Sequence, residues 1–237
     1  MKLMKKNVFN TYEEISRAAA EIVIVAIKEK PDLILGLPTG STPIGMYDAL
    51  AKAYKEGRVD FSRVVTFNLD EYAGLTPEHP QSYRYFMNKH LFSRINIKPQ
   101  NTHVPSGTAA GLDAAARAYD QAIEKSGGID LFVVGIGQNG HIGFNEPAAS
   151  MPAGTHVVTL TQNTIEANSR LFDDISEVPR QAVTQGMATI LKAKKIMLLS
   201  SGEIKRAALD KMFSGIITLD CPATLLNLHG DVTVLLS

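Results

Sequence analysis

Two adjacent carboxylates directly follow a short apolar run, in the segment Asn68-Leu-Asp-Glu-Tyr72. A carboxylate at the end of a buried strand is well placed to transfer a proton. Neighbouring side chains of a strand point to opposite faces, so Asp70 and Glu71 would diverge, and one acid could face a site while the other braces it. A polar turn with two solvated acids explains this segment equally well on its own.

A histidine and a glutamate lie in a glycine-rich segment, Gly135-Ile-Gly-Gln-Asn-Gly-His-Ile-Gly-Phe-Asn-Glu-Pro147. Imidazole titrates near neutral pH, so His141 and Glu146 are candidates for acid–base catalysis, although a lone histidine is more often structural. The glycines at 135, 137 and 140 spell G-x-G-x-x-G, the dinucleotide-binding pattern. That pattern must open a helix, and the glycines and prolines that follow it predict a loop, so we expect no dinucleotide site.

A third segment, Gly36-Leu-Pro-Thr-Gly-Ser-Thr-Pro-Ile-Gly45, offers small residues and hydroxyls ahead of a predicted helix. Backbone N–H groups in such a loop suit a phosphate, although the segment lacks the Gly-Lys-Ser/Thr of a Walker A loop. The alternative is a tight turn in which Thr42 caps the helix and Pro43 is its first residue.

Lys205 lies in the first turn of another predicted helix, where its charge opposes the helix dipole unless an anion binds nearby. The alternative is that Lys205 is simply an exposed lysine.

Each of these candidate segments follows a predicted strand, and the strands would hold the segments close to one another. Continuous apolar runs predict strands at 33–37, 64–67, 129–134, 195–200 and 232–236, and helical patterning predicts helices at 11–30, 43–55, 82–92, 110–125 and 203–213. This alternation predicts one α/β domain over residues 1–237, with a single doubly wound, mostly parallel sheet covered by helices on both faces. Ligands bind such sheets beyond the carboxyl ends of the strands, where the candidate residues lie.

The composition excludes several classes of protein. The 237 residues include 24 basic and 24 acidic side chains, so we expect no general binding to nucleic acid or to an anionic membrane. Cys221 is the only cysteine, which excludes an intrachain disulfide and a multi-cysteine zinc site. The other histidines lack metal-binding spacing, so we expect no metal. Without a secretory signal or a membrane span, the sequence predicts a cytoplasmic protein.

Taken together, the motifs resemble the glucosamine-6-phosphate deaminase family, within the superfamily that includes the 6-phosphogluconolactonases. The matching blocks are LGLPTGSTP at 35–43, FNLDEY at 67–72, GIGQNGHIGFNEP at 135–147, ANSR at 167–170 and SGEIKRAAL at 201–209. The resemblance implies a modified Rossmann-like fold. It also implies a hydrolase of amino-sugar catabolism that converts glucosamine 6-phosphate and water into fructose 6-phosphate and ammonia without a cofactor.

The resemblance also assigns roles to single residues. His141 would open the sugar ring, Glu146 would orient the imidazole, and Asp70 would move the proton from C2 to C1. Many family members have an aspartate where this chain has Asn139, and an amide supplies no charge, so Glu146 would have to take that role alone. The substrate phosphate would be held by the first loop and two cations, namely Thr39, Gly40, Ser41, Thr42, Arg170 and Lys205.

Two rival functions and one regulatory property follow from the same resemblance. A 6-phosphogluconolactonase-like hydrolase needs no carbon base, and a sugar-phosphate sensor needs no acid–base set. With about thirty residues before the first predicted strand, we expect no helix-turn-helix module. Allosteric family members bind N-acetylglucosamine 6-phosphate through an arginine and a lysine, where this chain has His156 and Val158. The chain also ends at Ser237, without the longer C-terminal extension of those members. We therefore expect a non-allosteric monomer or small homo-oligomer.

Overall fold

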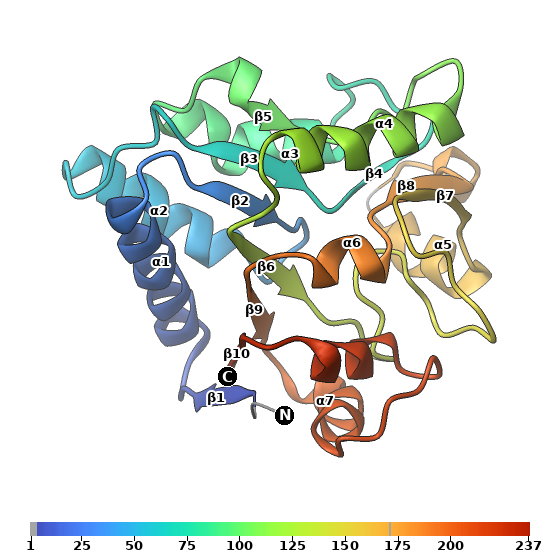
Figure 1. Cartoon of the computed structure of the whole chain (residues 1–237). Coiled ribbons are helices and arrows are strands. Elements are labelled where there is room, and N and C mark those ends of the chain that lie inside the picture. The colour runs from blue at the N-terminus through green and yellow to red at the C-terminus, as the bar shows by residue number, and fades with distance from the viewer. Residues whose placement is uncertain (1–3, 171) are drawn as a thin grey trace.

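A computed structural model of the chain describes residues 4–170 and 172–237, and a sheet of seven parallel strands forms its centre (Figure 1). The strand order is β1-β10-β9-β6-β2-β3-β5, and every neighbouring pair is parallel. The strands span Lys5–Val8 (β1), Ile34–Leu37 (β2), Val65–Asn68 (β3), Thr102–His103 (β5), Leu131–Gly135 (β6), Lys195–Ser200 (β9) and Val232–Leu236 (β10).

Helices cover both faces of this sheet, as the alternating pattern predicts (Figure 1). Leu35 and Leu37 of β2 pack into a core with helices α1, α2 and α3, whereas Ile34 packs on the opposite face with α4, α6 and α7. The prediction of a doubly wound parallel sheet is therefore confirmed. The helices span Tyr12–Glu29 (α1), Ile44–Lys55 (α2), Tyr83–His90 (α3), Leu112–Lys125 (α4), Met187–Leu191 (α6) and Arg206–Phe213 (α7).

A second, smaller sheet was not predicted. Three antiparallel strands, Asp70–Tyr72 (β4), Gln181–Thr184 (β8) and His156–Thr159 (β7), pair in the order β4-β8-β7. Tyr72 of this sheet, Phe144 and Ile165 of helix α5 (Gln162–Ser169) belong to a separate apolar cluster. The small sheet and α5 therefore form a unit beside the carboxyl end of the large sheet (Figure 1).

At the N-terminal side the start of the first helix agrees with the prediction, and the first strand needs correction. Thr11 caps α1 by accepting a hydrogen bond from the Glu14 backbone N–H at 3.1 Å, and the Glu14 carboxylate accepts one from the backbone N–H of Asn10 at 2.9 Å. The strand at 33–37 is not the first one. β1 precedes it, and its sequence Lys-Lys-Asn-Val gave no apolar signal because all four residues are exposed.

Two candidate phosphate residues also lie in different local structures from those predicted. Thr42 does not cap α2, because Pro43 occupies the cap position without a side-chain hydrogen bond. Lys205 does not lie in the first turn of an α-helix. A 3₁₀ helix spans Glu203–Lys205, and α7 begins at Arg206. Lys205 is therefore the last residue of the 3₁₀ helix and the N-cap of α7.

Four further 3₁₀ helices complete the described elements, at Phe92–Arg94, Pro99–Asn101, Ile175–Glu177 and Pro222–Leu228. Within residues 4–170 and 172–237, no helix is both long and apolar enough to cross a membrane.

The strand order brings the candidate segments together. β9, β6, β2 and β3 are consecutive in the sheet, and the segments that contain Lys205, His141, Thr39–Thr42 and Asp70 follow these strands in that order. From β2 the chain continues to β3 on one side, whereas β6 leads to β9 and β10 on the other. The carboxyl ends of β2 and β6 therefore flank the switch point at which doubly wound sheets bind ligands.

Candidate active site

Asp70 is buried at the point where the chain passes from the large sheet to the small one. β3 ends at Asn68, and Asp70 begins β4, where it pairs with Thr184 of β8. The residue is 6% exposed, and within the described part of the chain no hydrogen bond or ion pair to its carboxylate is found. Burial, with a smaller contribution from the charge of Glu71, raises the pKa of Asp70 to about 8.

Glu71 points the other way and braces helix α3, as the alternation of a strand predicts. Its Oε1 accepts hydrogen bonds from the backbone N–H groups of Tyr72 and Tyr83, both at 2.8 Å, and its Oε2 accepts one from Arg84 at 3.0 Å. These donors include the first N–H groups of α3, which the helix itself cannot satisfy. Burial nevertheless raises the pKa of Glu71, against the effect of these hydrogen bonds.

His141 lies in the loop after β6 and contacts two other polar side chains of that loop, Asn139 and Glu146. Its Nδ1 is 2.8 Å from Asn139 Oδ1 and 3.3 Å from Glu146 Oε1. Asn139 Nδ2 donates a hydrogen bond to Glu146 Oε2 at 2.7 Å. The three side chains therefore form one hydrogen-bonded relay. The segment after β6 is a loop, as predicted, and the next element along the chain is β7.

The contacts of Asn139 assign the tautomer of His141. The Asn139 amide nitrogen donates to Glu146, so its oxygen is the atom that faces the imidazole, and the same oxygen accepts from the His141 backbone N–H at 3.2 Å. An amide oxygen can only accept, so Nδ1 must be the protonated nitrogen of a neutral imidazole. Nε2 is then left with a free lone pair. An amide at position 139 thus contributes orientation, while Glu146 contributes the charge.

Glu146 differs from Asp70 in its environment. Burial alone would raise the pKa of Glu146, but hydrogen bonds from His141, Asn139 and Thr164, together with the positive charge that His141 can take, lower it. The carboxylate is 18% exposed, compared with 35% for the His141 side chain. Glu146 is therefore held as an anion next to the imidazole.

Two glycines let the His141 loop pack closely. A Cβ at Gly137 would overlap the His141 ring, so the imidazole packs directly against the backbone of Gly137. Gly143 has a φ of +61°, and a Cβ on it would lie 2.7 Å from Thr184 Oγ1. Thr184 also accepts a hydrogen bond from the Phe144 backbone N–H at 3.2 Å. Because Thr184 pairs with Asp70, this threonine joins the His141 loop to the strand of Asp70.

The loop after β2 meets a half-buried lysine. Lys205 Nζ donates to Thr42 Oγ1 at 3.3 Å, although the two residues are 163 positions apart. Burial lowers the pKa of Lys205, and no carboxylate of the described residues forms an ion pair with it. A desolvated ammonium without a counter-ion, beside a loop of hydroxyls and backbone N–H groups, suits an anionic ligand.

Tyr12, which the sequence did not single out, holds this loop in place. Its hydroxyl oxygen lies 3.0 Å from the carbonyl oxygens of both Ser41 and Thr42, and it accepts a hydrogen bond from the Gly45 backbone N–H at 2.8 Å. Gly45 itself packs against Ser16 of α1 so closely that a Cβ would overlap the serine hydroxyl. The sequence gave no signal for this role, because Tyr12 is simply the first residue of an amphipathic helix.

Arg170 is not brought into contact with the other candidate phosphate residues. It is exposed at the C-terminal cap of α5, on the unit formed with the small sheet. No hydrogen bond or ion pair between described residues links its side chain to Thr39–Thr42 or to Lys205. The structure thus joins Thr42 to Lys205 and His141 to Asn139 and Glu146, and leaves Arg170 apart.

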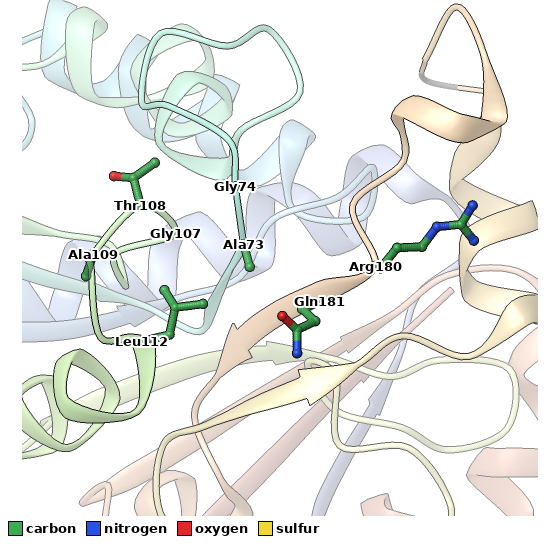
Figure 2. A pocket seen from close by; sticks show the side chains of 8 residues that line it. All are labelled: Ala73, Gly74, Gly107, Thr108, Ala109, Leu112, Arg180 and Gln181. Carbon is green, nitrogen blue, oxygen red and sulfur yellow. The ribbon is translucent and has the colours of Figure 1, made fainter.

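A surface cavity of about 510 Å³ lies next to the small sheet, and none of the candidate site residues lines it (Figure 2). The Arg180 guanidinium extends away from Thr108 and Leu112, so it does not make this hollow an anion site (Figure 2). The side of the cavity formed by residues 107–112 and 73–74 is apolar or small. Its lining residues are Ala73, Gly74, Gly107, Thr108, Ala109, Leu112, Arg180 and Gln181.

The described part of the chain contains no set of side chains that could bind a metal ion. No group of three or more histidine, cysteine, aspartate or glutamate side chains lies close enough to hold a metal ion there. Cys221 is buried, and its sulfur packs against Gly140 of the His141 loop.

Comparison with known proteins relates the whole chain to sugar-phosphate enzymes. A family model described as glucosamine-6-phosphate isomerases/6-phosphogluconolactonase matches residues 9–235. A glucosamine-6-phosphate deaminase of Thermoanaerobacter sp. (strain X514) is 56% identical over 233 residues, which cover 98% of this chain and 92% of that protein. One from Clostridium perfringens (strain 13 / Type A) is 51% identical over 232 residues, which cover 98% of this chain and 96% of the relative.

Solved structures give the same relationship. A structure described as a monomeric glucosamine-6-phosphate deaminase is 47% identical, with a TM-score of 0.95 over 98% of this chain and 97% of the other. The 6-phosphogluconolactonase of Thermotoga maritima is 19% identical, with a TM-score of 0.77 over 98% of both chains, and shares the fold alone. The chain belongs to the glucosamine-6-phosphate isomerase/6-phosphogluconolactonase family.

Proposed function

We propose that this protein is a glucosamine-6-phosphate deaminase, which converts glucosamine 6-phosphate and water into fructose 6-phosphate and ammonia. The relatives that are 51% and 56% identical over nearly the whole chain are named for this activity. The described residues of one chain supply every group to which we give a role. This agrees with a protein that works as a monomer, as the neighbour with a TM-score of 0.95 is described to do.

In the first step, His141 opens the sugar ring. Its Nε2 has the free lone pair, so it takes the proton of the anomeric hydroxyl and returns a proton to the ring oxygen. The imidazole is positively charged between these two transfers. Glu146, an anion 3.3 Å from Nδ1, stabilises that charge, and Asn139 keeps the ring in its orientation.

In the second step, Asp70 acts as the carbon base. It takes the proton from C2 and delivers one to C1, while a second proton passes from the amino group to O1. The open amino-aldose thus becomes a 2-imino ketose, which water hydrolyses to the ketone and ammonia. With a pKa of about 8, free Asp70 is mostly protonated at neutral pH. A substrate amino group that enters as ammonium would lower this pKa. We expect kcat/KM to rise as the pH increases through the pKa of the free protein.

The phosphate would bind at Thr39–Thr42 and Lys205. The ammonium of Lys205 lacks a counter-ion among the described residues, and a phosphate on the loop would supply one. Arg170 is exposed at the end of α5 and would have to approach the phosphate from the small-sheet side.

One observation gives this proposal its main support: two carboxyl groups on adjoining segments have opposite environments. Asp70 is buried with a raised pKa, whereas Glu146 is hydrogen-bonded with a lowered one. Such a pair suits a reaction that needs a proton carrier and, separately, a fixed anion. A lactonase needs no carbon base, and a sensor needs neither group.

The test is to incubate the protein with glucosamine 6-phosphate and to measure ammonia and fructose 6-phosphate together. We expect the two products in equal amounts. In a parallel assay, 6-phosphogluconolactone should be hydrolysed no faster than in buffer. Enzymatic lactone hydrolysis without ammonia release would favour the lactonase, and binding of glucosamine 6-phosphate without turnover would favour the sensor.

A further inference from the structure

A hydrogen bond from outside the His141 loop completes the relay. Thr164 Oγ1 donates to Glu146 Oε1 at 3.2 Å, and this is the same oxygen that lies 3.3 Å from His141 Nδ1. The other carboxylate oxygen already accepts from Asn139 at 2.7 Å. Glu146 is thus held on one side by its own loop and on the other by Thr164.

The Thr164 hydroxyl is itself fixed in direction. Thr161, the N-cap of α5, accepts from the Thr164 backbone N–H at 3.2 Å, and the two threonine hydroxyls are 2.9 Å apart. Because the single proton of the Thr164 hydroxyl goes to Glu146, Thr161 must be the donor between the two hydroxyls. The result is a chain of hydrogen bonds that ends on the carboxylate, and such chains strengthen each member.

The helix that contains Thr164 also leads to Arg170. Thr164 lies in the first turn of α5 and Arg170 is its C-terminal cap, so about 9 Å of helix axis separates them at a rise of about 1.5 Å per residue. Ile165 anchors this helix in the apolar cluster of the small sheet rather than in the cores of the large one. One short helix therefore places one residue on Glu146 and ends with an exposed cation.

We propose that Thr164 is a positioning residue of the reaction, whose hydroxyl holds the Glu146 carboxylate against His141 from the helix that ends in Arg170. The expected fall in kcat rests on the proposed function, whereas the expected change in the pKa of Glu146 does not. The titratable group that faces Glu146 is His141 on its own loop, and α5 contributes the neutral Thr164.

The experiment compares Thr164→Val, which keeps the shape and removes the hydroxyl, with Thr164→Ser, which keeps the hydroxyl. Thr159→Val is the matched control, because Thr159 is exposed on β7 and makes no side-chain hydrogen bond to the described residues. Hydrogen bonds to charged groups contribute enough to change a rate by roughly tenfold or more. We expect Thr164→Val to lower kcat by about tenfold, and Thr164→Ser and Thr159→Val to stay within about twofold of the parent.

The acidic side of the pH–rate profile reports the protonation of Asp70, so it cannot report that of Glu146. The protonation state of Glu146 is therefore measured directly, by carbon-13 NMR of its carboxyl in the ligand-free protein. The signal is assigned by its loss in Glu146→Gln. Since the Thr164 hydrogen bond helps to lower the pKa of Glu146, Thr164→Val should raise that pKa and Thr164→Ser should restore it. An unchanged Glu146 titration in folded Thr164→Val would overturn the proposal, as would a serine variant as impaired as the valine one. If the parent protein releases no ammonia, the proposed function fails while the NMR result still decides the role of Thr164.

Discussion

The start of β4 and the loop after β6 each place a carboxyl group at the same edge of the large sheet, and they treat it in opposite ways. Asp70 is fixed by backbone pairing and buried without a hydrogen-bond partner for its carboxyl among the described residues, so its pKa is about 8. Glu146 is fixed by side-chain hydrogen bonds, and its pKa is lowered. The difference shows that the environment, rather than the residue type, assigns the two acids to proton transfer and to charge stabilisation.

The comparison is tested most strongly by Asp70→Asn. This variant should lose turnover by roughly two to four decades, the usual contribution of a general base, while still binding the sugar phosphate. In the parent, substrate deuterated at C2 should lose its label to solvent or transfer it to C1, and in the variant this exchange should cease at the same time as ammonia release. Turnover close to that of the parent would remove Asp70 from the mechanism.

The same substitution should change the pH dependence of stability. In the folded protein Asp70 stays protonated up to a pKa of about 8, whereas the unfolded chain ionises near the ordinary value of 3.8. The stability that Asp70 contributes is therefore fully present below pH 3.8 and is lost as the pH rises towards 8. Asp70→Asn should lack this loss and gain, relative to the parent, on the order of 4 kcal/mol in free energy of unfolding between pH 4.5 and pH 8. Urea unfolding at both pH values measures this difference. If the free energy of unfolding changes with pH by the same amount in the two proteins, Asp70 is not protonated in the folded protein.

The phosphate end of the site extends the comparison to a cation. Lys205→Ala should raise the KM for glucosamine 6-phosphate by about tenfold with a smaller change in kcat, because a charge-assisted hydrogen bond is lost. Unphosphorylated glucosamine should be a very poor substrate for the parent. Lys195→Ala is the matched control, since Lys195 is exposed at the opposite end of β9. If both alanine variants keep the parental KM, Lys205 is only a surface lysine.

A smaller effect is expected from the tyrosine that holds the phosphate loop. Tyr12→Phe removes the hydroxyl that contacts Ser41, Thr42 and Gly45, and should raise KM roughly threefold with little change in kcat. Tyr54→Phe in α2 serves as the control, because no hydrogen bond of its hydroxyl to the described residues is found. A fall in kcat without a change in KM would mean that Tyr12 supports the proton-transfer end instead.

No effect at all is expected from an effector. From the family resemblance we expect His156 and Val158, on β7, to correspond to the arginine and lysine of allosteric members. The His156 ring nitrogen Nδ1 is 2.9 Å from the Gly154 carbonyl oxygen. These side chains offer no strong differential affinity for a phosphate in two states. Rate curves should be hyperbolic with or without N-acetylglucosamine 6-phosphate. Sigmoidal curves that the acetylated sugar phosphate makes hyperbolic would require an effector site built from other residues.

The large sheet was predictable because its inner strands are continuous apolar runs, and β9 was placed at Lys195–Ser200, where the structure has it. The small sheet was not, because β7 is only half buried and β4 is a three-residue strand with two acids, so neither has a clear alternation. Candidate groups next to large-sheet strands could be found for the same reason. Thr164 and Tyr12 could not, since their importance comes from contacts with residues 18 and about 30 positions away in sequence.

The position of β10 affects how the protein folds during synthesis. β10 pairs with both β9 and β1, so β1 has no partner strand in the described sheet until β10 emerges. Contacts between such distant segments form late. In the meantime β9, whose residues Ile196–Ser200 are all buried in the folded protein, presents an open strand edge. We therefore expect the nascent chain to be most prone to aggregation until Val232–Leu236 is free to pair, and a chaperone that covers that edge would act in this interval.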